Sequence, residues 1–248
     1  DVAELNAKQL LDQIPAYHAL IVRGRTKVTK DVFARAASLK VVGRAGVGVD
    51  NIDVNEATAR KILVVNAPAA STVSVAELAL GHMLSWCRFL PQADKSIKEG
   101  KWEKKMFEGH EIYGKTLGLI GSGRIGAEVA KRAQAFGMRV IAFDPYLAPD
   151  VAHRINVALV DKETVLRESD FVSIHAALTP ETRGMIGTAD LSMMKRSAVL
   201  VNGARGEIVQ EAALAEALKN GIIAGAALDV FETEPPAGSP LVSAPHVV

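Results

Sequence analysis

The stretch that decides the fold is residues 115–145, KTLGLIGSGRIGAEVAKRAQAFGMRVIAFDP. The apolar run 117–120 has the length of one strand and leads into three glycines spaced G-x-G-x-x-G. Apolar residues then recur at helical spacing up to Gly137, and a second apolar run, 139–143, ends at Asp144. Strand, glycine turn, helix, strand and terminal acid in this order predict a βαβ unit that binds a dinucleotide. The alternative is an ordinary βαβ turn without a ligand.

Each glycine has a mechanical role in such a unit. Gly121 makes the tight turn, Gly123 lets the backbone approach a pyrophosphate, and Gly126 lets the helix pack closely on the strand. The N-terminus of the helix offers free N–H groups and the positive end of a dipole. Asp144 stands where a carboxylate can accept hydrogen bonds from both ribose hydroxyls. A carboxylate there repels a 2′-phosphate, and no Arg or Lys follows before Arg154, so the predicted cofactor is NAD rather than NADP.

Composition bounds the remaining possibilities. The chain has 248 residues, of which 49% are hydrophobic and 23% charged, enough for one large or two modest domains. A net charge of +1 gives no general attraction to nucleic acid or to a membrane, and no apolar run reaches membrane-spanning length. Cys87 is the only cysteine, which suits a reducing, cytoplasmic location. The six histidines lack metal-ligand spacing, so no metal site is predicted.

Helical and strand patterns alternate along the chain, which predicts parallel sheets. Before the central unit the expected helices are 3–12, 31–37 and 53–60, and the expected strands are 19–22, 40–43 and 63–65. After it we expect helices 161–168, 188–194 and 210–219, and strands 170–176, 198–202 and 222–229, with a last strand starting at Val247. Between the two parts, residues 74–77 form a capping-box sequence for a helix that reaches Phe89. Residues 91–114 form a polar arm with Trp102 and Phe107 as anchors.

The predicted fold class is α/β. A doubly wound parallel sheet (Rossmann) with strand order 3-2-1-4-5-6 is expected in residues 67–248. A second, smaller and incomplete α/β domain is expected in residues 1–66. Residues 66–70, with Pro68, form a hinge between the two. Three short strands are few for a stable sheet, so we expect the smaller domain to receive a strand from outside the 248 residues.

Two other nucleotide-related motifs are excluded. Residues 109–116 fit the P-loop pattern G-x-x-x-x-G-K-[ST] by letter, but polar residues precede them and a strand, not a helix, follows. The Tyr-x-x-x-Lys pair of short-chain dehydrogenases is absent, because none of the three tyrosines has Lys four positions later.

Polar residues follow the ends of the later predicted strands. Arg205 lies in the run Asn-Gly-Ala-Arg-Gly after one strand, and Asp229 ends the next strand, with Glu234 close behind. Ligands of open α/β sheets bind at the carboxyl ends of strands, and Arg205 suits bidentate binding of a carboxylate. Taken singly, Arg205 could equally form a surface salt bridge, and Glu234 could be a solvated loop acid. Their shared place beside the predicted nicotinamide favours a catalytic role.

Several runs together resemble the D-isomer-specific 2-hydroxyacid dehydrogenase family. They are residues 41–51, Trp102 with its Lys-rich flank, 121–126 with 144–145, His175 with 178–182, 202–206, and 226–236. The resemblance implies a flavodoxin-like smaller domain and hydride transfer between NAD and C2 of a small D-2-hydroxy or 2-keto acid. The expected substrate is 3-phosphoglycerate. Alternatives are a glyoxylate/hydroxypyruvate or D-lactate-type reductase, and a non-catalytic NAD-sensing module like the corepressors that share this fold. We expect a homodimer or homotetramer with its interface in residues 75–113.

The resemblance also implies roles for individual residues. Arg205 and Glu234 would be catalytic, with Glu234 holding a catalytic histidine and raising its pKa. The substrate would be bound by Val47, Gly48 and Arg205. The cofactor would be bound by a larger set: Val47, Gly121, Gly123, Arg124, Ile125, Gly126, Asp144, Ala176, Gly203, Ala204, Arg205 and Asp229.

The catalytic histidine is expected beyond Val248. His246 is the only histidine after Glu234, but it precedes a predicted strand, whereas active-site groups gather where strands end. The chain departs from the family pattern at Ala177, where Pro is usual, at Glu207, where Gly is usual, and at residues 24–25, where a Ser-containing loop is usual. The departure at 24–25 leaves the identity of the substrate open.

Overall fold

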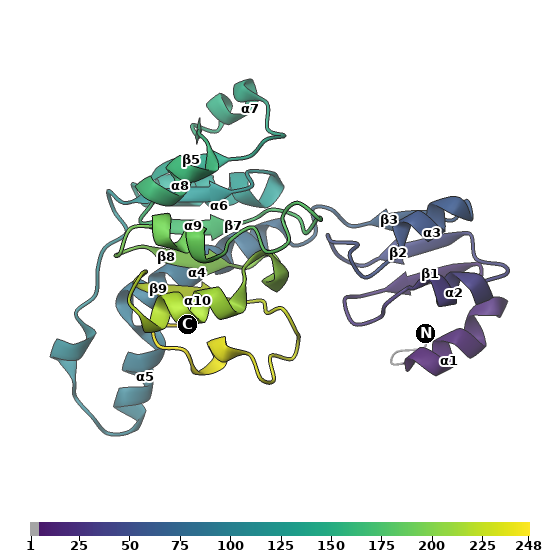
Figure 1. The fold of residues 1–248 in the computed structure, drawn as a ribbon, viewed down its shortest axis with the longest axis horizontal. Coiled ribbons are helices and arrows are strands. Elements are labelled where there is room, and N and C mark those ends of the chain that lie inside the picture. The colour runs from purple at the N-terminus through teal and green to yellow at the C-terminus, as the bar shows by residue number, and fades with distance from the viewer. Residues whose placement is uncertain (1–4) are drawn as a thin grey trace. The chain divides into compact units, whose positions relative to one another are not determined.

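A computed structural model describes residues 5–248. The chain divides into two compact units, one ending at Thr72 and the other spanning Val73–Val248 (Figure 1). The smaller unit has a three-stranded sheet in the order β1-β2-β3, and the larger has a six-stranded sheet in the order β6-β5-β4-β7-β8-β9. All neighbouring strands run parallel, so the predicted α/β class is confirmed.

The six strands of the larger unit follow the predicted order 3-2-1-4-5-6. They are β4 (Thr116–Ile120), β5 (Arg139–Phe143), β6 (Ala158–Leu159), β7 (Phe171–Ile174), β8 (Val199–Asn202) and β9 (Gly225–Leu228). Strand β6 is the third strand of this sheet along the chain and lies at its edge, next to β5. Neither β6 nor the helix before it, α7 (Pro149–Arg154), was predicted from the sequence. A strand of two residues is too short to give a periodic signal. The strand predicted at 170–176 is therefore the fourth, β7, which pairs with β4.

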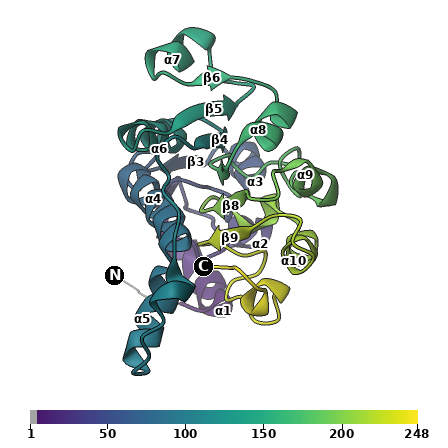
Figure 2. The ribbon, with the colours of Figure 1, turned by 90° about the vertical axis from the view of Figure 1, so that its left-hand side faces the viewer.

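Helices cover both faces of this sheet (Figure 2). One face carries α4 (Thr72–Arg88) and α6 (Arg124–Ala135), and the other carries α8 (Lys162–Glu168), α9 (Thr188–Met193) and α10 (Glu211–Lys219). Successive strand residues point to opposite faces, so Leu119 packs in one cluster with Met83 of α4 and Ile120 packs in the other with Leu166 of α8. No helix within residues 5–248 has the length and apolar character needed to cross a lipid bilayer.

Trp86 joins α4 to β9 at the amino-terminal end of the strand. A Cβ on Gly225 would lie 2.0 Å from Trp86 Nε1, so the missing side chain of this glycine makes room for the indole. Trp86 Nε1 donates a hydrogen bond to the carbonyl oxygen of His246 at 3.3 Å. Val247 forms a parallel bridge with Ala226, as the predicted start of a last strand requires.

The smaller unit consists of α1 (Ala7–Gln13), β1 (Ala19–Val22), α2 (Lys30–Arg35), β2 (Val41–Arg44), α3 (Val54–Ala59) and β3 (Leu63–Asn66). The helix expected at 3–12 begins outside the described residues; α1 itself starts after Asn6, which forms a capping box with Gln9. The helices bury one face of the sheet, and the other leaves Ile21, Leu63 and Val65 exposed.

One prediction about the connection between the units is wrong. Helix α4 begins at Thr72, so Ser74 lies in its first turn and cannot be its N-cap. The polar arm at 91–114 contains two elements that were not predicted, the end of α5 (Leu90–Lys98) and a 3-10 turn, η2 (Lys104–Phe107). Phe107 packs on Phe89 with 6.3 Å between ring centroids, whereas Trp102 is 81% exposed.

We predict opposite effects for two glycine-to-alanine substitutions, Gly225 at the contact between α4 and β9 and Gly81 within α4. Gly225→Ala should lower the free energy of unfolding by about 1–3 kcal/mol, because the added methyl overlaps the Trp86 indole. Gly81→Ala should raise it by about 0.5–1 kcal/mol, because Gly81 lies inside α4 and no other group of the described chain lies within 4 Å of its added methyl. Urea denaturation followed by tryptophan emission measures both. Equal changes in the two variants would contradict the packing described.

Candidate active site

Strand register brings the predicted cofactor residues to one edge of the six-stranded sheet. Ile174 pairs with Ile120 on one side and with Asn202 on the other. The last residues of the outer strands, Phe143 and Leu228, continue the same row. The residues that follow these strand ends are therefore neighbours: Gly121, Asp144, His175, Ala176, Gly203 and Asp229.

The three glycines after β4 have different surroundings. A Cβ on Gly121, whose φ is +89°, would lie 2.8 Å from the backbone nitrogen of Ala176. A Cβ on Gly126 would lie 2.5 Å from the carbonyl oxygen of Gly121. At Gly123 no atom of the described chain would lie within 4 Å of a Cβ. The first and third glycines thus permit close packing inside the protein, whereas Gly123 faces open space that a pyrophosphate could approach.

The donors and the acid for a dinucleotide stand around this turn. Helix α6 follows Gly123, which has no side chain to cap it, so the first-turn N–H groups of Arg124 and Ile125 lack a side-chain acceptor. The Asp144 carboxylate accepts hydrogen bonds from the backbone N–H of Ser122 at 2.8 Å and of Tyr146 at 2.9 Å. These bonds hold the acid beside the turn. Uncapped donors, an open approach and a fixed carboxylate fit NAD.

The side chain of Asn202 shapes the loop that carries Arg205. Asn202 is buried at the end of β8; its Nδ2 donates to the carbonyl oxygen of Arg205 at 3.0 Å, and its Oδ1 accepts from the N–H of Ala204 at 3.1 Å. The N–H of Ala204 is therefore used within the protein. Arg205 Nη1 donates to the carbonyl oxygen of Ala204 at 2.6 Å. The sequence analysis assigned no role to Asn202, although a polar residue closing the apolar strand Val-Leu-Val-Asn is a usable signal.

The loop after β9 brings Glu234 next to the Arg205 loop. The N–H of Asp229 donates to the carbonyl oxygen of Asn202 at 3.0 Å. A Cβ on Gly206 would lie 1.9 Å from the carbonyl carbon of Phe231, so the two loops are in direct contact. The Glu234 side chain is exposed, and its Oε1 accepts a long hydrogen bond, 3.4 Å, from the N–H of Phe231.

His246 lies away from this edge. Its carbonyl oxygen accepts hydrogen bonds from Ala226 near the start of β9 and from Trp86. Within residues 5–248, no hydrogen bond or ion pair joins His246 to Glu234. The geometry agrees with the expectation that His246 is not the partner of Glu234.

Val47 and Gly48 belong to the smaller unit, at the carboxyl edge of its own sheet. Asn66 Nδ2, at the end of β3, donates to the carbonyl oxygen of Val47 at 2.6 Å. Within the described residues, the N–H groups of Val47 and Gly48 donate no hydrogen bond. Both donors therefore remain available for an anion such as a carboxylate.

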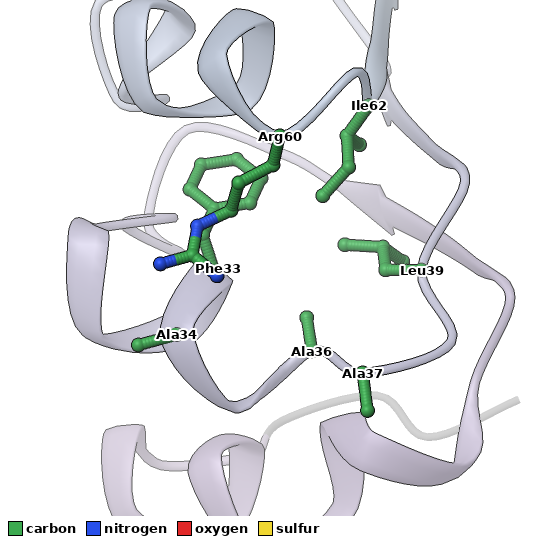
Figure 3. A pocket seen from close by; sticks show the side chains of 7 residues that line it. All are labelled: Phe33, Ala34, Ala36, Ala37, Leu39, Arg60 and Ile62. Atoms are coloured by element: carbon green, nitrogen blue, oxygen red, sulfur yellow. The ribbon is translucent and has the colours of Figure 1, made fainter.

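The smaller unit also contains a cavity of about 310 Å³ at the opposite edge of its sheet (Figure 3). Leu39 and Ile62, which precede β2 and β3, form part of its wall, and Arg60 at its rim is ion-paired with Glu56 at 2.7 Å. None of the predicted site residues lines the cavity. Its position at the amino-terminal ends of the strands separates it from the ligand edge.

Two histidines on the α4 side of the sheet were not predicted as site residues. His175 Nε2 lies 2.9 Å from Ser173 Oγ, and burial lowers the pKa of His175 to about 4. Burial also lowers the pKa of His82 in α4, and the charge of Asp229 opposes that shift. Within residues 5–248, the buried His175 Nδ1 and His82 Nε2 have no hydrogen-bond partner. Burial thus favours the neutral form of both imidazoles.

A glycine turn open at its middle glycine, an uncapped helix and a fixed acid after the second strand define a dinucleotide-binding unit of the dehydrogenase type. Comparison with known families shows which family of dehydrogenases this unit belongs to. Residues 80–248 match the model described as D-isomer specific 2-hydroxyacid dehydrogenase, NAD binding domain. The chain belongs to this family, and its cofactor is NAD.

Known relatives cover nearly all of the chain. It is 53% identical over 245 residues to D-3-phosphoglycerate dehydrogenase of Methanocaldococcus jannaschii, which covers 98% of this chain and 47% of the relative. It is 49% identical over 232 residues to hydroxypyruvate reductase of Thermotoga maritima, and the match covers 94% of this chain and 75% of the relative. The solved structure of the TT0316 protein of Thermus thermophilus has 37% sequence identity and a TM-score of 0.90, and the match covers 100% of this chain and 79% of that protein. The chain thus spans about half the length of the D-3-phosphoglycerate dehydrogenases that it matches.

We predict that Gly123→Ala weakens NAD binding without unfolding the protein. The alanine methyl meets no other group of the described protein within 4 Å, but it occupies the space that a pyrophosphate needs. The dissociation constant for NAD should rise at least about tenfold, a loss of about 1.4 kcal/mol, while the urea midpoint stays at the wild-type value. Calorimetric titration and urea denaturation measure the two quantities. Unchanged NAD affinity would contradict the role given to Gly123.

We predict that His175 makes the larger unit sensitive to acid. In the unfolded chain this histidine binds a proton below its ordinary pKa of 6.5, whereas in the folded chain it does so only near pH 4. Acidification through this window therefore favours unfolding. His175→Gln removes the titrating ring, so the variant should lose less stability than the wild type on acidification. Urea midpoints across the window test this, with the exposed His153→Gln as control; equal losses in wild type and His175→Gln would rule the explanation out.

Proposed function

We propose that the full-length protein is an NAD-dependent dehydrogenase that oxidises 3-phosphoglycerate at C2 to 3-phosphohydroxypyruvate, the entry step of serine synthesis. The similarity to the M. jannaschii enzyme over nearly all of this chain carries the choice of substrate. The meeting of the Arg205 and Glu234 loops at the NAD edge supports the reaction class.

The proposed mechanism assigns one task to each residue. Bound NAD supplies the acceptor for the hydride that leaves C2. Arg205 binds the substrate carboxylate and the oxygen on C2, which becomes the keto oxygen of the product; this fixes the orientation of C2 and raises the rate by proximity. Glu234 holds a histidine that takes the hydroxyl proton, and its charge raises the pKa of that histidine. Val47 and Gly48, in the smaller unit, are proposed to bind the substrate through their N–H groups.

A basic edge of the smaller unit supports a phosphorylated substrate. Asn51 Nδ2 donates to the carbonyl oxygens of Arg23 at 2.9 Å and Thr26 at 2.7 Å, which ties the Arg23–Arg25 loop to the segment after β2. A Cβ on Gly24 would lie 3.7 Å from Arg44 Nη2. Arg23 and Arg25 in the loop after β1 and Arg44 at the end of β2 thus lie at the carboxyl edge of these strands, where we place the phosphate. Arg88, at the end of α4, lies instead at the amino-terminal edge of the larger sheet, two residues after the Trp86 that packs against Gly225.

A second candidate function is reduction of glyoxylate or hydroxypyruvate. The T. maritima hydroxypyruvate reductase is nearly as similar to this chain, and the match covers three quarters of it. A D-lactate-type reductase and an NAD-sensing corepressor-like module are further alternatives. Residues 24–25, where the chain departs from the family pattern, lie beside the proposed phosphate site. This loop is therefore the feature that would distinguish between the competing substrates.

Activity assays of the purified full-length protein separate these functions. The test measures NADH formation from 3-phosphoglycerate and D-lactate, and NADH consumption by glyoxylate, hydroxypyruvate and 3-phosphohydroxypyruvate. The proposal requires the phosphorylated pair to give the highest kcat/KM. A preference for hydroxypyruvate selects the second candidate, and tight NAD binding without turnover of any acid selects the NAD-sensing module.

We also propose a cytoplasmic homodimer or homotetramer with its interface in residues 75–113. Apolar side chains exposed on α4, α5 and the following arm support this surface, namely Leu78, Leu90, Ile97, Trp102 and Met106. Exposed apolar clusters of this kind mark interaction sites. Light scattering at micromolar concentration tests the proposal, and a monomer would contradict it.

We predict that Asp144 excludes NADP by charge. Asp144→Asn removes the negative charge that would face a 2′-phosphate, so the ratio of NADP to NAD affinity should rise about tenfold, or about 1.4 kcal/mol. Binding titrations with both cofactors measure this ratio. Asp150→Asn, which removes an exposed acid of α7, serves as the charge-matched control and should leave the ratio unchanged. Equal affinity of the wild type for NAD and NADP would refute the assignment.

We predict that Glu234→Gln in the full-length protein lowers the pKa that governs activity, by roughly one unit. The physical reason is that the carboxylate favours an imidazolium partner and the amide does not. The pH dependence of kcat/KM measures the shift, and Glu163→Gln, an exposed acid of α8, is the control. An unchanged pH profile in Glu234→Gln would remove the proposed histidine partnership.

A further inference from the structure

A buried carboxylate outside the predicted site closes the segment that carries Glu234. Glu211, the first residue of α10, is 7% exposed. Its Oε1 accepts a hydrogen bond from the N–H of Glu232 at 2.7 Å, and its Oε2 accepts one from the hydroxyl of Ser239 at 2.5 Å. In return, the N–H of Glu211 donates to Glu232 Oε1 at 3.1 Å. We call these three residues the Glu211 clamp, because they tie both ends of segment 232–239 to one helix.

The clamp depends on the hydrogen bonds that the Glu211 carboxylate accepts. No basic side chain in the described part of the chain forms an ion pair with its carboxylate. A buried carboxylate is costly unless hydrogen bonds satisfy it, and the N-terminal end of a helix favours a negative charge. Opening the segment would leave both oxygens without their donors. The segment is therefore held closed by the need to satisfy this carboxylate.

The clamped segment is the surface against which the Arg205 loop packs. A Cβ on Gly206 would lie 2.3 Å from the nitrogen of Glu232, the same N–H that donates to Glu211. Asn202 fixes the carbonyl oxygen of Arg205 from the other side. Among the residues that the structure describes, the Glu234 carboxylate has one hydrogen bond, 3.4 Å long, from the N–H of Phe231. The position of Glu234 relative to Arg205 is thus set by the clamp rather than by Glu234.

We propose that Glu211 is a positioning residue for the reaction: through Glu232 and Ser239 it fixes Glu234 relative to Arg205. This inference rests on the proposed function for the roles of Glu234 and Arg205. Glu211 touches neither substrate nor cofactor, so its removal should disturb substrate handling and proton transfer but leave NAD binding intact.

Steady-state kinetics of the full-length protein give the first test. Glu211→Ala should lower kcat/KM for the 2-hydroxy acid about tenfold to a hundredfold, because small misplacements of catalytic groups have effects of this size. The KM for NAD should stay at the wild-type value. Ser239→Ala should show a smaller loss that Ser239→Thr, which keeps the hydroxyl, restores. Glu216→Ala, an exposed acid on the same helix, is the control. Wild-type kcat/KM in Glu211→Ala, or an equal rise in the KM for NAD, would overturn the proposal.

The pH profile separates positioning from a general loss of stability. If Glu211 acts through Glu234, Glu211→Ala should lower the pKa that governs activity in the same direction as Glu234→Gln. The double variant should then show the same pKa as Glu234→Gln alone, because the two residues act on one interaction. Additive shifts in the double variant, or no shift in Glu211→Ala, would overturn the proposal.

A measurement without turnover distinguishes failure of this inference from failure of the proposed function. Hydrogen–deuterium exchange of the folded full-length protein should be faster across residues 231–239 in Glu211→Ala and unchanged across 121–126. If the wild type turns over no 2-hydroxy acid, the proposed function fails, but the exchange result still decides whether Glu211 closes the segment. Unchanged exchange across 231–239 would overturn the proposal.

Discussion

Parallel pairing of the central strands is the constraint on which the candidate site depends. Because β5, β4, β7, β8 and β9 run in one direction and in register, their carboxyl ends form a single row. Every segment that leaves this row starts at the same edge, whatever its distance along the chain. Backbone hydrogen bonds between the strands are therefore enough to bring four features together: the glycine turn, Asp144, the Arg205 loop and the Glu234 loop.

Close backbone contacts then refine that arrangement. Gly121 approaches the backbone of Ala176, and Gly206 approaches Phe231, at distances that no side chain would allow. These contacts join neighbouring loops in two pairs, one after β4 and β7 and the other after β8 and β9. The buried amide of Asn202 and the buried carboxylate of Glu211 add hydrogen bonds to backbone groups in the second pair. Buried polar groups of this kind are costly to leave unpaired, which makes the loop positions specific.

The sequence was most informative where local patterns and tertiary structure agree. The strand at residues 117–120, the glycines and the helix after them could be predicted because each has its own periodic or turn signal. Strand β6 could not, since its two residues are held by pairing with β5 rather than by an apolar run. The structural role of Glu211 could not be predicted from the sequence for a related reason. A glutamate at the first position of a helix is common on surfaces, and only the fold shows that Ser239 and Glu232 close over it. Trp102, predicted as an anchor, is 81% exposed in this structure. Local sequence shows that an aromatic ring is present but not which surface covers it.

A crystal structure of the full-length protein with NAD tests the central claim most directly, namely that this edge holds the dinucleotide through the Gly123 turn and Asp144. The account predicts the pyrophosphate at the N–H groups of Arg124 and Ile125, with the adenosine ribose hydroxyls bonded to the Asp144 carboxylate and the nicotinamide beside Asp229. A pyrophosphate bound elsewhere, or a ribose beyond hydrogen-bond reach of Asp144, would contradict it.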